Sequence, residues 1–339
     1  MLAYLRYEQW IKPEIIPGLP FRWYGLMYLV AFGITYLLFS RQVKKRDLNI
    51  SQDDIVNVFF WCIIGLLIGA RLFATLLFDL SGYYWRNPHR IFWPFDEHFK
   101  FVGLAGMNYY GGLVGAVVAG LIYARKKKID AVEWADMLAG GIPLGYTFGR
   151  LGNFINGELF GRITKLKWGM VFPHARTFPA SEEWVSDFAS EIGMDIGGAV
   201  SVNLPRHPTQ LYEAIFDGFL IWVLIWFVVR KRRPFPGFTI GFYIIAYGLV
   251  RFLIDYLRVP LTGEFFITLS SKPNPPYLYM TPFNFIPSQL YSLLMVLFGV
   301  LYLLLVRRFY RPPEVRVSKQ EETKQTSTRK LKKKIDRSR

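Results

Sequence analysis

The 339-residue sequence contains one cysteine, Cys62, and only four histidines. A single cysteine excludes an intrachain disulfide, and its place in an apolar segment favours a packing role over that of a nucleophile. The histidines are scattered, and none has the paired histidine or carboxylate spacing that is typical of metal sites. We therefore expect no metal centre, and in particular no metal ligand at His207.

Acidic residues are also scarce, with 25 Asp and Glu against 41 Lys and Arg, which gives a formal net charge of +16. This charge does not indicate a nucleic-acid surface, because the basic residues gather in short clusters between apolar segments. With 52% hydrophobic and 18% aromatic residues, the chain is too apolar for an ordinary soluble domain. The composition predicts an all-α polytopic membrane protein.

Seven apolar segments approach the roughly 20 residues that a transmembrane helix needs. They are Tyr24–Phe39, Val56–Phe78, Phe101–Ala124, Trp134–Leu151, Ile215–Val229, Phe238–Leu257 and Leu290–Val306. The fourth is the weakest, because it contains Asp136 and many glycines. With seven spans, the basic clusters that begin at Arg41, Arg125, Arg230 and Arg307 all fall on one side, which the positive-inside rule makes cytoplasmic.

This topology places the N-terminus outside and the C-terminus in the cytoplasm. Residues 1–311 then form a single transmembrane catalytic domain, in which the segment from about 156 to 207, between the fourth and fifth helices, is extracytoplasmic. Residues 312–339 are polar, rich in lysine and without aromatics. We expect them to be a disordered cytoplasmic tail that touches anionic lipid.

The sequence GRLGNFINGELFG, Gly149–Gly161, places charged and amide side chains at the end of the fourth apolar segment. A charge within a membrane span is costly and usually marks a cavity or a partner. Arg150 and Asn153 are three residues apart and share a helix face. Glu158 follows where the glycines favour a bend. A structural ion pair at Arg150 is the alternative.

A second polar stripe lies in the sixth apolar segment, where Tyr247, Arg251, Asp255 and Arg258 recur on one helix face. Two cations against one carboxylate leave an unbalanced positive charge, which suits an anionic ligand. A purely structural pair of Arg251 with Asp255 is the alternative. Arg258 is closer to the outer end, and we expect it at the membrane interface.

The sequence RHPTQLYE leads from outside into the fifth apolar segment. Pro208 and Glu213 fit helix initiation and the helix dipole, which needs no functional role for either. That account does not explain the other polar residues at this boundary: Arg206, His207, Gln210 and Tyr212.

These stretches resemble the prolipoprotein diacylglyceryl transferase family. Gly149–Gly161 matches every fixed position of the signature G-R-x-G-N-F-x-N-x-E-x-x-G. The resemblance covers most of the chain outside the tail, because further motifs follow in family order: RWYGLMYLV at Arg22–Val30, YGGLVG at Tyr110–Gly115, RHPTQLYE and the Tyr247–Arg258 stripe.

The resemblance implies a bacterial cytoplasmic (inner) membrane enzyme that takes phosphatidylglycerol as donor. Such enzymes move the diacylglyceryl group to the lipobox cysteine thiol of a prolipoprotein signal peptide, giving a thioether and releasing glycerol 1-phosphate. Arg150 and Arg251 would stabilise the leaving phosphate, and no cofactor or nucleic acid is involved. The implied lipid site comprises Arg150, Tyr24, Asn153, Asn156, Gly161, Arg206, His207, Gln210, Tyr247 and Asp255.

The thiol reacts as thiolate, so it needs a base or a positive field. Many family members have a histidine before the paired glycines, where this sequence has Tyr110, and a tyrosine is a poor base at neutral pH. We expect Tyr110 to donate a hydrogen bond to the phosphate, with Glu158 as the leading alternative base. Asp255 stands where glutamate is common, and we expect it to balance Arg251.

Two other classes stay open. An anion or lipid transporter would also place arginines in membrane spans, but it predicts internal repeats or paired broken helices, which the sequence does not show. Another lipid-phosphate enzyme, such as a phosphatase, commonly needs acidic metal clusters. No D-x-x-D grouping lies in a span of this sequence.

Overall fold

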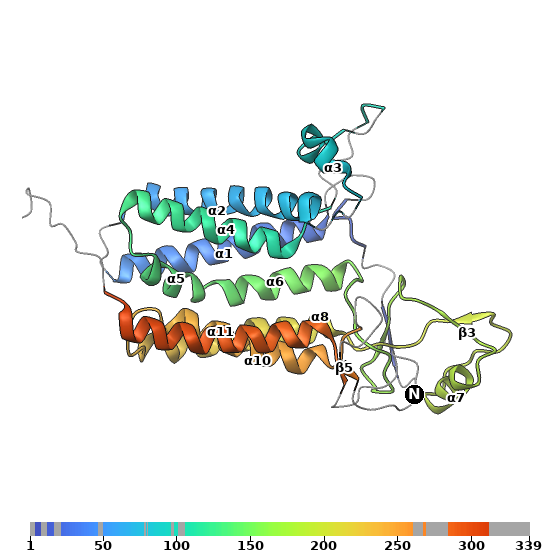
Figure 1. Cartoon of the computed structure of the whole chain (residues 1–339). Coiled ribbons are helices and arrows are strands. Elements are labelled where there is room, and N and C mark those ends of the chain that lie inside the picture. Colours follow the sequence, from blue (N-terminus) through green and yellow to red (C-terminus); the bar gives the residue numbers. More distant parts are fainter. Residues whose placement is uncertain are drawn as a thin grey trace, which may run out of the picture.

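The computed structural model describes residues 4–7, 12–16, 22–46, 50–77, 79, 81–95, 98–100, 106–259, 267–268 and 284–311. The described chain is mostly helical, and its long helices lie side by side in a bundle with a smaller, strand-containing part at one end (Figure 1). Among the described residues, five helical segments are long and apolar enough to cross a membrane: Trp23–Lys45, Gln52–Leu77, Thr209–Lys231, Phe238–Asp255 and Pro287–Phe309. The chain is therefore a multi-pass membrane protein.

The bundle contains the helices α1 (Trp23–Lys45), α2 (Gln52–Leu72), α4 (Tyr109–Lys127), α5 (Ala131–Ala139), α6 (Ile142–Ile155), α8 (Thr209–Glu213), α9 (Ile221–Phe227), α10 (Phe238–Asp255) and α11 (Pro287–Phe309). Two π-helical segments extend α2 and α8, namely η1 (Phe73–Leu77) and η3 (Ala214–Leu220). The shorter helices are α3 (Tyr83–Arg86), η2 (Pro88–Ile91), α7 (Glu183–Glu191) and η4 (Val229–Lys231).

Each of the seven predicted apolar segments contains helix, and the main departures from the prediction are in the third and fourth segments. The third helix begins at Tyr109 and not at Phe101, because Asn108 caps it by accepting the N–H of Gly111 at 3.0 Å; residues 101–105 lie outside the described part. The fourth segment is two helices, α5 and α6, that break at Gly140–Gly141. A Cβ on either glycine would press into α1, so the break allows close approach to that helix.

The strand-containing part follows α6 and has a core of its own. β1 (Leu5–Arg6) pairs in parallel with β2 (Met170–Val171), so the N-terminal segment is fixed to this part. β3 (Phe178–Pro179) pairs antiparallel with β4 (Ser201–Val202), and β5 (Ile267–Thr268) pairs antiparallel with β6 (Asn284–Phe285). The core includes Tyr4, Ile163, Phe178, Val185, Phe188, Ile192, Val202 and Leu204.

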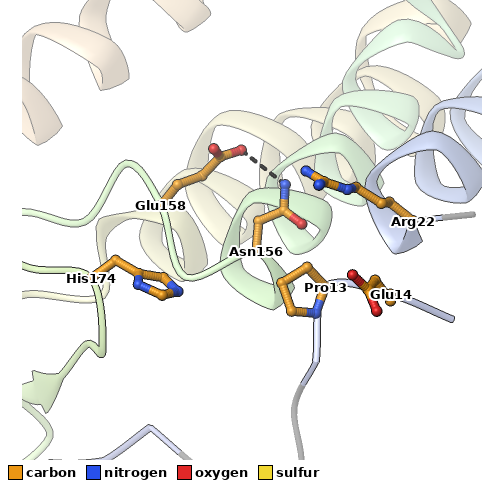
Figure 2. Close-up of a pocket in the computed structure, with 6 residues that line it drawn as sticks. All are labelled: Pro13, Glu14, Arg22, Asn156, Glu158 and His174. Atoms are coloured by element: carbon orange, nitrogen blue, oxygen red, sulfur yellow. Dashed lines mark hydrogen bonds between the residues drawn. The ribbon is translucent and has the colours of Figure 1, made fainter. Parts of the chain in front are cut away.

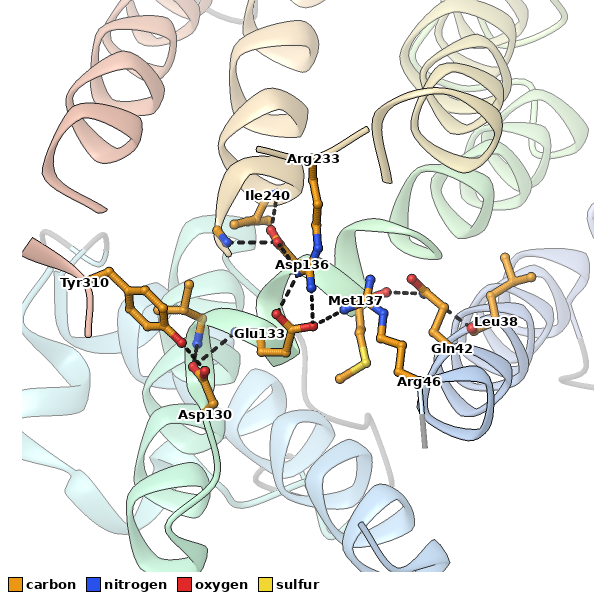
Figure 3. A network of polar contacts seen from close by, with 12 residues as sticks. Leu38, Gln42, Arg46, Asp130, Glu133, Asp136, Met137, Arg233, Ile240 and Tyr310 are labelled. Atoms are coloured by element: carbon orange, nitrogen blue, oxygen red, sulfur yellow. Dashed lines mark hydrogen bonds and ion pairs between the residues drawn. The ribbon is translucent and has the colours of Figure 1, made fainter. Parts of the chain in front are cut away.

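Acidic residues of α5 join the helices at the opposite end of the bundle (Figure 3). Asp136 of α5 accepts the N–H of Gly237 at 2.8 Å and that of Ile240 at 2.9 Å, so it caps the start of α10. Arg233 lies 3.1 Å from Asp136 and 2.7 Å from Glu133, which also pairs with Arg46 after α1. The charge that made the fourth apolar segment look weak is thus a structural link between α1, α5 and α10.

α2 and α4 contact each other through their backbones. Gly65 and Gly69 of α2 face Gly111 and Gly115 of α4, and a Cβ built on any of the four would lie less than 3.0 Å from backbone of the other helix. Small residues at such a contact let two helices gain dispersion energy along their length in lipid, where no hydrophobic effect drives association. This close contact depends on glycine at all four positions.

We therefore expect Gly115→Ala to lower the thermal unfolding midpoint of the purified protein in detergent. Forcing a methyl group into a packed contact costs about 1–3 kcal/mol. Gly33→Ala in α1 is the matched control, because a Cβ there meets nothing within 4 Å. An equal midpoint for the two variants would contradict the close contact.

Candidate functional site

The buried carboxylate of Glu213 lies at the centre of the polar cluster in the bundle. Its side chain is 1% exposed. One oxygen is 2.7 Å from Nε of Arg150, and the other is 2.9 Å from Nη1 of Arg251 and 2.5 Å from Nη1 of Arg258. The hydroxyl of Tyr146 donates to the first oxygen at 3.2 Å. Three guanidinium groups, one from α6 and two from α10 and the turn after it, thus meet on one carboxylate.

Sequence reasoning assigned Glu213 only a helix-initiation role, and that interpretation is wrong. Glu213 ends α8 and is continuous with the π-helical η3, which places it between α6 and α10. The signal that could have found it is the unbalanced positive charge of the Arg251 stripe. A buried cation needs a nearby anion, and RHPTQLYE supplies a glutamate at the same end of the bundle.

Asp255 is the second carboxylate of the cluster. Its Oδ1 lies 3.1 Å from Nε of Arg251 and 3.9 Å from Nε of Arg258, so the expected balancing of Arg251 is confirmed. Arg258, expected at the membrane interface, instead joins the cluster, and its side chain is 12% exposed.

A third carboxyl group, that of Asp217 in η3, was also missed from the sequence. It is fully buried four residues after Glu213, and neither oxygen has a hydrogen-bond partner among the described residues. Three guanidinium groups against two contacting carboxylates carry a net charge of +1 when Asp217 is neutral and zero when it is ionised. The net charge of the cluster therefore differs by one unit between the two protonation states of Asp217.

The signature stretch continues from the cluster toward the strand-containing part. Nη1 of Arg150 donates to Asn153 at 3.2 Å, which confirms their predicted shared face. Nδ2 of Asn153 donates to Oε1 of Glu158 at 2.9 Å, and Nδ2 of Asn156 donates to the same oxygen at 3.3 Å. The predicted bend is present, because Gly157 has a φ of 66°, a conformation that favours glycine. Arg150 is thereby linked to Glu158 by hydrogen bonds.

Glu158 lines a polar pocket at the end of α6 (Figure 2). The pocket has a volume of about 300 Å³. Its lining comes from the segment before α1 and from the residues that follow α6: Pro13, Glu14, Arg22, Asn156, Glu158 and His174. Sequence reasoning missed Glu14, Arg22 and His174, because the N-terminal segment reaches the pocket only through tertiary contacts such as the β1–β2 pair.

The predicted residues Gly161, Arg206 and Gln210 hold the strand-containing part against the bundle. Gly161 donates its N–H to the carbonyl of His207 at 2.8 Å, and a Cβ there would collide with the carbonyl of Leu257. Arg206 is 1% exposed, donates to the carbonyl of Arg176 at 3.0 Å, and lies over the rings of Phe160 and Phe178. Gln210 donates to the carbonyl of Glu158 at 2.5 Å.

His207 lies beside Tyr212, with Nδ1 3.4 Å from the hydroxyl. Burial and the nearby charge of Arg162 lower the pKa of His207 to about 4, so its imidazole is neutral near pH 7. A neutral imidazole adds no positive charge for a phosphate. The predicted contacts of this group of residues with lipid stay predictions.

Three predicted tyrosines occupy different helices. Tyr247 donates to the Tyr146 hydroxyl at 3.5 Å, which connects it to Glu213. Tyr24 of α1 has its hydroxyl 2.9 Å from that of Tyr28, and its ring packs near Gly152 of α6. Tyr110 is in the first turn of α4, is 51% exposed, and has its ring 6.1 Å from that of Tyr291 of α11.

The fold and the cluster define a polytopic membrane protein with buried guanidinium groups suited to an anionic ligand and a polar pocket at one end. A profile of the family described as Prolipoprotein diacylglyceryl transferase matches residues 13–306. The chain therefore belongs to the prolipoprotein diacylglyceryl transferase family.

Curated relatives agree with this assignment over nearly their whole length. The chain is 42% identical to the phosphatidylglycerol–prolipoprotein diacylglyceryl transferase of Treponema pallidum (strain Nichols), over 91% of this chain and 97% of the relative. It is 44% identical to the enzyme of the same name from Treponema denticola, over 90% and 95%. It is 34% identical to that of Borreliella burgdorferi (strain ZS7), over 91% and 95%.

We expect Glu213→Gln to destabilise the protein strongly, because three guanidinium groups would lose the charge on which they meet. Removing one partner of a buried ion pair costs about 3–5 kcal/mol. The matched control is Glu191→Gln, an exposed glutamate that pairs with Lys165. The measurement is the thermal unfolding midpoint in detergent. A Glu213→Gln protein as stable as the control would show that the cluster does not depend on this charge.

Proposed function

We propose that this chain transfers the diacylglyceryl group of phosphatidylglycerol to the lipobox cysteine thiol of prolipoproteins, forms a thioether and releases glycerol 1-phosphate. The curated relatives bear the name of this activity. The single observation in the structure that carries the proposal is the meeting of Arg150, Arg251 and Arg258 on Glu213. Such a cluster suits a lipid phosphate held within a membrane protein.

Arg150 and Arg251 are proposed to hold the phosphate. Each guanidinium group has five N–H donors, and the contacts with Glu213, Asn153 and Asp255 use only some of them. Those contacts fix the orientation of each guanidinium group, and its remaining N–H donors are available to phosphate oxygens. When the glycerol carbon–oxygen bond breaks, negative charge accumulates on the phosphate, and fixed positive groups stabilise it more than they stabilise the bound lipid.

The polar side chains around the arginines are proposed to orient the lipid. Asn153, Asn156 and Tyr24 present hydrogen-bonding groups without adding charge, and Tyr247 lies beside the cluster through Tyr146. We also propose that Tyr110 donates a hydrogen bond to the phosphate. Gly161, Arg206, His207, Gln210 and Asp255 complete the proposed lipid site, the first four by shaping its wall.

The first test mixes the purified protein with phosphatidylglycerol vesicles and a lipobox peptide and then weighs the peptide. We expect a mass gain of one diacylglyceryl unit. An unchanged peptide together with lipid flux across the vesicles would favour a transporter, and phosphate release without peptide modification would favour another lipid-phosphate enzyme.

In the same assay we expect Arg150→Lys to lose most of the transfer while the protein stays folded. A point ammonium cannot reproduce the bidentate grip of a planar guanidinium group on phosphate. Arg86→Lys, at an exposed position in α3, is the matched control for the same chemical change. Wild-type turnover by Arg150→Lys would remove this residue from the phosphate site.

We further propose seven membrane crossings, with the N-terminus outside, the segment from about 156 to 207 extracytoplasmic, and the C-terminus inside the bacterial cytoplasmic membrane. The helix order in Figure 1 supports this arrangement, because α5 lies at one end of the bundle and α7 beyond the other. The exposed basic residues at the end of α4 then face the cytoplasm, in agreement with the positive-inside rule.

Labelling of intact cells tests this topology. An impermeant amine reagent should modify Lys167, which is exposed in the strand-containing part, and should leave Lys126, which is also exposed, at the end of α4, unmodified. Permeabilised cells provide the control, in which both should react. Labelling of Lys126 from outside would overturn the proposed orientation.

A further inference from the structure

The proposed transfer needs a group that takes the proton of the lipobox thiol, whose ordinary pKa is near 8.5. In a signal peptide the cleavage region follows the apolar segment, so the thiol enters at the membrane surface and not at its centre. The polar pocket lies where α6 ends and the strand-containing part begins (Figures 1 and 2), at the end of the bundle that the proposed topology puts at the outer membrane surface. We therefore expect the proton acceptor among the residues that line the pocket.

Among the six residues that line the pocket, His174 is the only imidazole. It is exposed, so a proton that it takes can pass to water. Figure 2 shows its ring and the Glu158 side chain on one side of the pocket, with Glu14 and Arg22 on the other. Imidazole is the side chain whose ordinary titration falls between pH 5 and 8, which suits a general base.

The pocket is also connected by hydrogen bonds to Arg150, which we propose binds the phosphate. Glu158 accepts from Asn153, and Asn153 accepts from Arg150, at 2.9 and 3.2 Å. Glu158 accepts from both Asn153 and Asn156, so its Oε1 is already occupied by two donors. Glu14, Glu158 and Arg22 are the charged residues that line the pocket together with His174.

We infer that His174 accepts the proton of the lipobox thiol, in the transferase reaction proposed above. The S–H proton moves to a ring nitrogen of His174, and the thiolate sulfur forms a bond to the glycerol carbon of the lipid. The bond between that carbon and the phosphate oxygen breaks, and its electron pair leaves with glycerol 1-phosphate. The imidazolium then releases its proton to water at the open side of the pocket.

The test measures peptide transfer against pH for the wild type, His174→Gln and the control His89→Gln, an exposed histidine in η2. The wild-type rate should rise as imidazole loses its proton and then level. His174→Gln should be about 100-fold slower near pH 7, the lower end of what a general base contributes, and should recover toward wild type above the pKa of the thiol. Imidazole added to His174→Ala should restore part of the rate, whereas His89→Gln should behave as wild type.

The other outcomes separate the competing explanations. A wild-type pH profile for His174→Gln would overturn the inference. Loss of activity at every pH, without rescue by imidazole, would also overturn it and assign His174 a structural role. If Glu158→Gln lost the rise in transfer rate on the acid side of the pH profile and His174→Gln kept it, the base would be Glu158. If the wild type itself transferred nothing to the peptide, the proposed function would fail and not the assignment of His174 alone.

Discussion

The structure of the site depends on one constraint, which is that a buried guanidinium group needs a counter-charge. Three of them meet on Glu213, and that carboxylate is the only group that contacts all three among the ion pairs of the described chain. The pairing fixes the relative positions of α6, α8 and α10, because each of the two longer helices contributes an arginine. Desolvation makes such an assembly costly unless every charge is matched. The geometry of the cluster and the packing of these helices are therefore set together.

The backbone beyond α6 is shaped so that the signature residues reach both the cluster and the pocket. A left-handed turn at Gly157 reverses the chain after Asn156 and returns Glu158 toward Asn153. Three residues later, Gly161 passes so close to Leu257 that only a glycine fits. The hydroxyl of Tyr7, from the N-terminal segment, caps the last carbonyls of α6 at Phe154 and Ile155. The glycines of the signature thus position its polar residues.

The sequence alone predicted the features that local spacing determines. The shared face of Arg150 and Asn153, the bend before Glu158, the pairing of Arg251 with Asp255 and the apolar helices all follow from short-range periodicity. Glu213, Asp217 and the pocket lined by His174 escaped because they depend on contacts between distant segments, and Glu213 also fits an ordinary role near a helix start. The division of the fourth segment was missed for a related reason. The glycines at its break allow close packing against α1, which is a contact between distant segments.

In the proposed reaction, the acidic residues of the cluster limit how tightly its arginines hold the lipid and the released product. Arginines without counter-charges would hold phosphatidylglycerol and glycerol 1-phosphate tightly alike, and uniform tight binding does not accelerate a reaction. Glu213 and Asp255 offset most of the positive charge while the lipid phosphate carries a single negative charge. As the carbon–oxygen bond breaks, the phosphate gains a second negative charge, and donors already held in place respond without reorganisation. By occupying some donors, the carboxylates weaken the hold on the bound lipid and on the released product, while the fixed orientation of the remaining donors is kept for the transition state.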